Sequence, residues 1–252
     1  MHNMRQLQIV TAADVLEEVG GGISFKDLTS VKDIIGFGEL ETVGGDLQML
    51  DLNALETNEA SNRIMFRKVK SIAGQLRVYD TFTRNALKEH NLQSHTWFTA
   101  LEQCKSINLH GGRTSMDLRG AFPNLIKVGN VEIGHGRFRL NGEKMFAILE
   151  QIDGGLSIES IKDCPEDHDE DRCMHNFEGW FPKLKSVKER LRIAESSAVT
   201  GFGFDSLQRV GNFQLQNLPL LAMCKSKLDR LINVVSSSND EDQIRPATVN
   251  DC

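Results

Sequence analysis

The stretch Phe37-Gly-Glu-Leu40-Glu-Thr-Val43-Gly-Gly-Asp-Leu47-Gln-Met49 contains the pattern that decides the fold. An aromatic residue, a leucine and a valine follow one another at intervals of three residues, and two glycines come directly after the valine. With Val43 as an anchor, the same spacing of apolar residues recurs over residues 13 to about 220. The anchors are Val19, Val43, Ile72, Cys104, Val128, Ile152, Val187 and Val210.

Two columns of apolar residues precede the anchors. The residue three positions before each anchor is always aliphatic. Six positions before the anchor stands Ala13 in the first unit and phenylalanine in the others, so seven of the 13 phenylalanines share one register and are expected to form one buried stack. These seven are Phe37, Phe66, Phe98, Phe122, Phe146, Phe181 and Phe204.

An apolar-polar-apolar triplet follows every anchor, which is the alternation of a strand with one buried face. The central residues of the triplets should therefore point outward as a ladder on one sheet, where they could bind a protein or a glycan or simply face solvent. They are Ser24, Gln48, Arg77, Asn108, Glu132, Ser157, Arg192 and Gln214.

Successive anchors are separated by 24, 29, 32, 24, 24, 35 and 23 residues, which indicates a basic unit near 24 with three insertions. A unit of this size cannot bury its own apolar face, so it is stable only when stacked in a solenoid. The glycines that follow the anchors, such as Gly44-Gly45 and Gly129, suit a bend that needs positive φ.

The composition is that of a soluble globular protein and excludes more functions than it identifies. The chain of 252 residues is 40% hydrophobic and has a net charge of −6, with 35 acidic and 29 basic residues. Because Lys and Arg are scattered, nucleic acid is not expected as a partner. No window approaches the ~18 consecutive apolar residues of a spanning helix, so no transmembrane segment is expected in this chain.

The recurring register, clearest in Phe204-Asp-Ser-Leu207-Gln-Arg-Val210-Gly211-Asn-Phe213-Gln-Leu215, resembles the receptor L-domain family. This family is a leucine-rich-repeat-like right-handed β-helix. The resemblance implies a mainly β repeat solenoid of about eight coils. Its members are generally binding modules of cell-surface or secreted proteins, and the L domain as a class does not identify a ligand.

The segment after the last coil resembles the capping segment of bacterial and protist members of that family. It contains Leu218-Pro219, Cys224, a helical stripe of Leu228, Leu231 and Ile232, and a terminal Cys252. We expect a single solenoid over residues 1–235, with an N-terminal strand near Leu7 and Ile9 and a small C-terminal helix. A polar tail, 236–252, then returns to the terminal cysteine.

Five cysteines are sorted by the repeat register. Cys104 occupies an anchor position and should be a buried thiol. The other four divide into Cys164 with Cys173 and Cys224 with Cys252, and two disulfides imply an oxidising compartment. Against this, residues 1–10 are not a signal peptide, and the chain has no N-x-[ST] sequon. We favour an extracellular or cell-surface location, with the cytoplasm as the alternative.

Two of the insertions contain candidate sites. Tyr79, His95 and Trp97 border the insertion at 81–96, where they form either an aromatic ligand platform or the contacts that hold a short helix on the solenoid. The third insertion is an acidic loop that a Cys164–Cys173 disulfide would close, followed by Trp180, which could pack inward or line a contact surface. Its weak candidates for metal ligands are Glu166, Asp167, His168, Asp169, Asp171 and His175.

No nucleophile elbow, phosphate loop, zinc-protease helix or dinucleotide fingerprint occurs, so no cofactor and no catalytic residue is expected. We expect a non-catalytic recognition or adhesion module for a protein or glycan ligand. Its candidate contacts are Tyr79, His95, Trp97, Trp180, Arg77, Glu132 and Arg192. The alternatives are an intracellular leucine-rich-repeat scaffold and a β-helix carbohydrate-active enzyme, although Glu132 has no second carboxylate beside it in the outward ladder.

Overall fold

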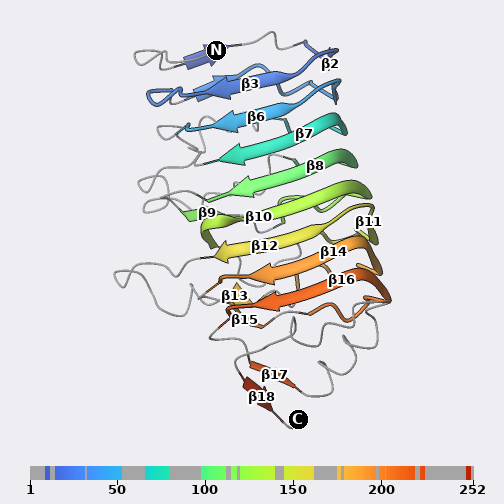
Figure 1. Ribbon diagram of the computed structural model, residues 1–252. Coiled ribbons are helices and arrows are strands. Elements are labelled where there is room, and N and C mark those ends of the chain that lie inside the picture. The colour runs from blue at the N-terminus through green and yellow to red at the C-terminus, as the bar shows by residue number, and fades with distance from the viewer. Residues whose placement is uncertain are drawn as a thin grey trace.

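The structure is a computed structural model, and it is a stack of parallel strands that follow one another in chain order from the N-terminal to the C-terminal end (Figure 1). The described residues are 9–11, 15–31, 33–52, 66–79, 98–111, 115–117, 120–139, 145–161, 175–176, 179–196, 199–201, 203–218, 222–224 and 248–250. They contain strands and turns but no helix, and none of them belongs to a helix that could cross a membrane. The prediction of a mainly β repeat solenoid is confirmed.

Twelve strands form the main sheet, in which all pairings are parallel. They are β2 (Glu18–Val19), β3 (Ile23–Lys26), β5 (Thr42–Val43), β6 (Leu47–Leu50), β7 (Ser71–Tyr79), β8 (Gln103–His110), β9 (Ser115–Asp117), β10 (Lys127–Arg139), β11 (Gln151–Ile152), β12 (Leu156–Ile161), β14 (Ser186–Ala194) and β16 (Arg209–Gln216).

Six short strands form three further parallel pairs. The first pair begins at Ile9, near the position where an N-terminal strand is expected, and residues 1–8 are outside the described part. The pairs are β1 (Ile9–Thr11) with β4 (Asp33–Ile35), β13 (His175–Asn176) with β15 (Val199–Gly201), and β17 (Ala222–Cys224) with β18 (Thr248–Asn250).

The predicted register is confirmed at every step. Each anchor is paired with the anchor of the next unit, from Val19 opposite Val43 through to Val187 opposite Val210. The apolar residues of the triplets pair in the same way. A parallel ladder places chemically equivalent residues next to one another, so these columns become continuous rows in the core.

The phenylalanine column forms the predicted buried stack. All seven rings are at most 8% exposed, and each contacts the next along the column, with ring centroids 4.8 to 5.9 Å apart. Trp180 is 1% exposed and lies 6.5 Å from the ring of Phe181. Its inward packing places the indole in the core and not on a contact surface.

The expectation of positive φ at the glycines after the anchors is wrong. Among the described residues the glycines in the left-handed region are Gly36 and Gly120, which lie elsewhere in the coil. A Cβ on Gly44 would instead lie 2.3 Å from the backbone oxygen of Gly20, and one on Gly129 would lie 2.4 Å from that of Lys105. Glycine is therefore needed because the backbones of neighbouring coils approach closely.

The left-handed conformation occurs at a different corner, two residues beyond the end of the outward triplet. Non-glycine residues adopt it there in coil after coil, with φ between 52° and 56°. Beyond this corner β10 runs on to pair with β9, which joins the main sheet only through β10 among the described strands. The residues are Asp27, Asp51, His135, Ser160 and Glu195, with Asn217 at 53° in the last of these corners.

Several predictions lie outside the described residues. They are the insertions at 53–63 and 81–96, residues 164–174 of the acidic insertion, and the helical stripe of residues 228–232, together with most of the tail 236–252. Of that tail, β18 pairs with β17, so the chain does return to the segment containing Cys224.

Cys104 is buried as predicted, with its Sγ 3.0 Å from the backbone oxygen of Ser106. Burial raises the pKa of this thiol to about 11, against the opposing effect of its backbone hydrogen bonds. About one thiol in a thousand is then ionised at pH 8, and the thiolate is the form that reacts. We expect iodoacetamide to leave Cys104 unlabelled in the native protein at pH 8 and to label it in guanidinium chloride, as measured by peptide mass spectrometry.

The same pKa difference predicts a pH dependence of stability. The unfolded thiol ionises near its ordinary pKa of 9.0 and the folded thiol near 11, so stability should fall as the pH rises through this interval. Cys104→Val, which places an anchor residue used elsewhere in the column, is the control and should remove this contribution. If iodoacetamide labelled Cys104 in the native protein at the rate of an exposed thiol, the burial of Cys104 on which both predictions depend would be contradicted.

Candidate functional site

The outward face of the main sheet contains two parallel rows of side chains. The first row is the predicted ladder, with Arg77 opposite Asn108, Asn108 opposite Glu132, and Ser157 opposite Arg192. The second row lies two residues further along each strand, where Tyr79 is opposite His110. Because Gly134 occupies the next position of the second row, the row has a gap beyond His110.

Tyr79 and His110 stack on each other across β7 and β8. Their ring centroids are 4.3 Å apart at an interplanar angle of 13°. Burial lowers the pKa of His110 from its ordinary value, and the nearby His135 lowers it further, while Glu132 opposes both. Burial also raises the pKa of Tyr79, with a smaller contribution from the charge of Glu132. The imidazole of His110 is therefore favoured in its neutral form.

Glu132, in the middle of β10, is held on both of its carboxylate oxygens. Its Oε1 lies 3.1 Å from Nε2 of His110, and Nδ2 of Asn108 donates a 2.9 Å hydrogen bond to its Oε2. The Oδ1 atom of Asn108 is buried and has no hydrogen-bond partner among the described residues. A buried polar atom left without a partner costs stability, so the amide of Asn108 is better explained by its support of Glu132 than by the fold.

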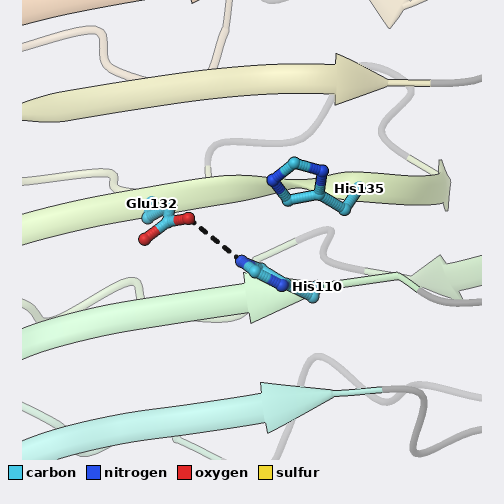
Figure 2. A group of neighbouring side chains, drawn as sticks. All are labelled: His110, Glu132 and His135. Atoms are coloured by element: carbon cyan, nitrogen blue, oxygen red, sulfur yellow. Dashed lines mark hydrogen bonds and ion pairs between the residues drawn. The ribbon is translucent and has the colours of Figure 1, made fainter.

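His135 reaches this face because of the corner. Strand alternation alone would turn its side chain inward, after Ile133, but its φ of 54° ends the alternation and leaves the imidazole exposed. The ring lies 4.9 Å from that of His110, centroid to centroid. Figure 2 shows Glu132 and His135 rising from β10 and His110 from β8, with the imidazole of His110 directed at Glu132.

A second carboxylate does lie on the sheet face of an adjacent coil, contrary to the expectation that none would, although it is in the second row and not in the ladder itself. Glu159 occupies the second row on β12, opposite Gly134. Its carboxylate accepts a hydrogen bond from the hydroxyl of Ser157 and forms an ion pair with Arg192. Burial alone would raise the pKa of Glu159, but the hydrogen bonds from Ser157 and Arg192 and the charge of Arg192 outweigh it, so the pKa is lowered. A general acid for glycoside cleavage needs the opposite shift.

The structure brings together four of the residues that the sequence analysis singled out. Tyr79 and Arg77 on β7, Glu132 on β10 and Arg192 on β14 lie on the outward face of the same sheet, with β8 between β7 and β10 and β12 between β10 and β14. His95, Trp97 and the acidic-loop residues 166–171 lie outside the described residues, as do Cys164, Cys173 and Cys252. The side chains of His175 and Cys224 are also outside the description, although both residues belong to strands.

The sequence analysis missed His110 and His135. His110 could have been found by continuing the outward ladder two residues beyond Asn108, since side chains on one face of a strand recur every second residue. His135 could not have been found in this way, because its position in the alternation predicts an inward side chain.

Comparison with known proteins adds no family to this description. No protein-family model, no curated protein and no solved structure matches the chain. The functional argument therefore rests on the outward face itself.

Proposed function

We propose that this chain is a non-catalytic recognition or adhesion module that binds its ligand on the outward face of the main sheet. The resemblance to the receptor L-domain family supports this proposal. In this reading the chain is a right-handed solenoid of about eight coils and forms the extracellular part of a cell-surface or secreted protein.

The observation that carries the proposal is the polar and aromatic surface formed by Arg77, Tyr79, Asn108, His110 and Glu132. These residues come from three neighbouring strands: Tyr79 stacks on His110, Asn108 and His110 contact the carboxylate of Glu132, and Arg77 donates to Gln75 of its own strand. A surface whose side chains are already ordered loses less conformational entropy on binding. Tyrosine and arginine are also the residue types that contribute most at protein interfaces.

A protein ligand suits this face better than a glycan. Glycan sites commonly offer an open aromatic ring face, whereas Tyr79 and His110 cover one another and Leu50 is the neighbour of Tyr79 on the other side. The charged side chains of Arg77 and Glu132 lie beside the two rings in the adjacent row. Such charges match the hydrogen-bonding groups of a protein surface.

The lowered pKa of Glu159 supports a binding role over hydrolysis. Its carboxylate is held ionised by Arg192 and is therefore not available to protonate a leaving group. The carbohydrate-active enzyme considered from the sequence would require a raised pKa at one of the paired carboxylates.

Ligand selection from a displayed peptide library tests the face. Clones selected on the wild-type chain should lose at least about tenfold in affinity for a double variant, Arg77→Ala with Glu132→Ala, because hot-spot residues contribute more than 1 kcal/mol each. The matched control is Lys127→Ala with Arg209→Ala, which removes two exposed cations outside the outward rows and should leave binding unchanged. Equal affinity of the selected peptides for the double variant Arg77→Ala with Glu132→Ala and for the wild type would refute the proposed surface. Selective binding of the wild-type chain to glycans on an array would show that the ligand is a glycan and not a protein.

The compartment is tested by counting thiols in denaturant without reductant. One reactive thiol, Cys104, is expected if Cys164 pairs with Cys173 and Cys224 with Cys252. The pairing of Cys224 with Asn250 in β17 and β18 supports the second disulfide, because Cys252 follows two residues later. Five reactive thiols would instead favour the intracellular scaffold.

A further inference from the structure

Three side chains on the outward face present one potential metal-ligating atom each to a common point. The ligand atoms of His110, Glu132 and His135 all lie within 4.8 Å of one another. The three residues come from two adjacent strands, β8 and the corner that ends the outward part of β10 (Figure 2). The cluster combines two imidazoles with one carboxylate, so it differs from an ordinary group of surface acids.

One separation in this cluster, between His110 and Glu132, is close to that of a tetrahedral zinc site. Zn–N and Zn–O bonds of 2.0 to 2.2 Å place two ligand atoms about 3.4 Å apart. Nε2 of His110 and Oε1 of Glu132 are 3.1 Å apart, which is already in that range. His135 is exposed, so a change of side-chain rotamer can bring its nitrogen closer without disturbing the core.

The surroundings of the cluster hold two of the three ligands in place. Asn108 donates to Oε2 of Glu132, which leaves Oε1 directed at His110. Tyr79 stacks on the imidazole of His110 and fixes the plane of that ring. Contacts of this kind orient metal ligands and strengthen binding in proteins. They also account for the buried amide of Asn108, whose Oδ1 has no partner among the described residues.

We propose that His110, Glu132 and His135 bind one Zn²⁺ ion on the outward face of the solenoid. A donor set dominated by imidazole suits zinc and related transition metals, whereas Ca²⁺ and Mg²⁺ take oxygen ligands almost entirely. Three protein ligands leave a fourth position of the tetrahedron for water or for a group of a bound partner. Because binding of the free ion is sufficient to show the site, the inference stands apart from the proposed recognition function.

The test uses the full chain, free of metal and with its exposed thiols alkylated, titrated with Zn²⁺ against a chromophoric zinc chelator. Alkylation removes cysteine thiolates as competing ligands. Three variants each remove one ligand and keep the local structure. His110→Phe preserves a ring that stacks on Tyr79, Glu132→Gln preserves the shape of the side chain, and His135→Asn places a residue that tolerates the left-handed corner.

We expect one equivalent of Zn²⁺ to bind the wild-type chain and each ligand variant to weaken binding at least about tenfold. The thermal midpoint of the wild type should rise with Zn²⁺, and that of the variants should not. Two controls replace histidines elsewhere: His95→Ala, and His168→Ala combined with His175→Ala in and beside the acidic loop. Both should bind zinc like the wild type.

Three results would overturn the proposal. The first is the absence of zinc binding by the wild-type chain, and the second is unchanged zinc affinity in folded ligand variants. The third is the loss of binding only when His168 and His175 are replaced, which would place the metal at the acidic loop. Circular dichroism of each variant establishes that it is folded, so a loss of affinity can be assigned to the missing ligand.

Discussion

Replacing Phe122 by alanine should lower the free energy of unfolding by about 3 to 5 kcal/mol. The ring is 1% exposed and lies between Phe98 and Phe146, with centroid distances of 5.9 and 5.4 Å. Removing it leaves a cavity in the middle of the stack, and the neighbouring coils cannot close that cavity because their backbones are tied together by the parallel ladders. The loss therefore combines the transfer energy of the ring with the cost of the cavity.

Chemical unfolding followed by circular dichroism measures this effect, with Gln48→Ala as the control. Gln48 lies in the outward ladder, where its amide contacts Asp46, so its replacement should change stability by less than about 0.5 kcal/mol. A loss below about 1 kcal/mol for Phe122→Ala would contradict a stack that holds the coils together. Repeat proteins can unfold in parts, so the transition should be shown to have the same midpoint by fluorescence and circular dichroism.

The second large effect is expected for Gly44→Ala, which should destabilise the chain by about 1 to 3 kcal/mol or more. An added Cβ would lie 2.3 Å from the oxygen of Gly20 in the preceding coil, and no flexible side chain is there to move aside. The two coils would have to separate at a point where the Gly44 amide donates a 2.7 Å hydrogen bond to Val19. The strain therefore falls directly on the contact between coils.

Gly20→Ala is a closely matched control, because Gly20 follows its anchor as Gly44 does but has nothing within 4 Å of its Cβ position. Its replacement should leave stability within about 0.5 kcal/mol of the wild type. Hydrogen exchange of the amides in β5 and β6 should become faster in Gly44→Ala and remain unchanged in Gly20→Ala. Equal effects of the two substitutions would show that the glycines serve the local turn and not the stacking of coils.

The glycines after the anchors illustrate why a correct pattern can be given the wrong physical reason. The sequence placed them at a bend, and several do separate two short strands, as Gly44 and Gly45 do between β5 and β6. Their backbone conformation is ordinary, however, and the constraint on them is the neighbouring coil. A contact between residues 24 positions apart is not visible in the local sequence.

The candidate site shows the same division. Arg77, Glu132 and Arg192 were placed on the outward face from strand alternation, and the ladders confirm that they lie in one row. The grouping of His110, Glu132 and His135 was not predicted. It depends on the stacking of β8 beside β10 and on the left-handed residue that turns the chain at His135.

By itself, the sequence determined the solenoid, its register and the residues of its core, because each unit repeats the same spacing and equivalent residues must meet when units stack. Only the tertiary structure decided which polar residues of different coils meet on the surface, and which glycines are required. Apolar periodicity specifies the buried rows through the hydrophobic effect, which sums over many residues. Side chains that meet across coils depend on strand pairing and corner conformation, where a single left-handed residue is enough to move an imidazole into the site.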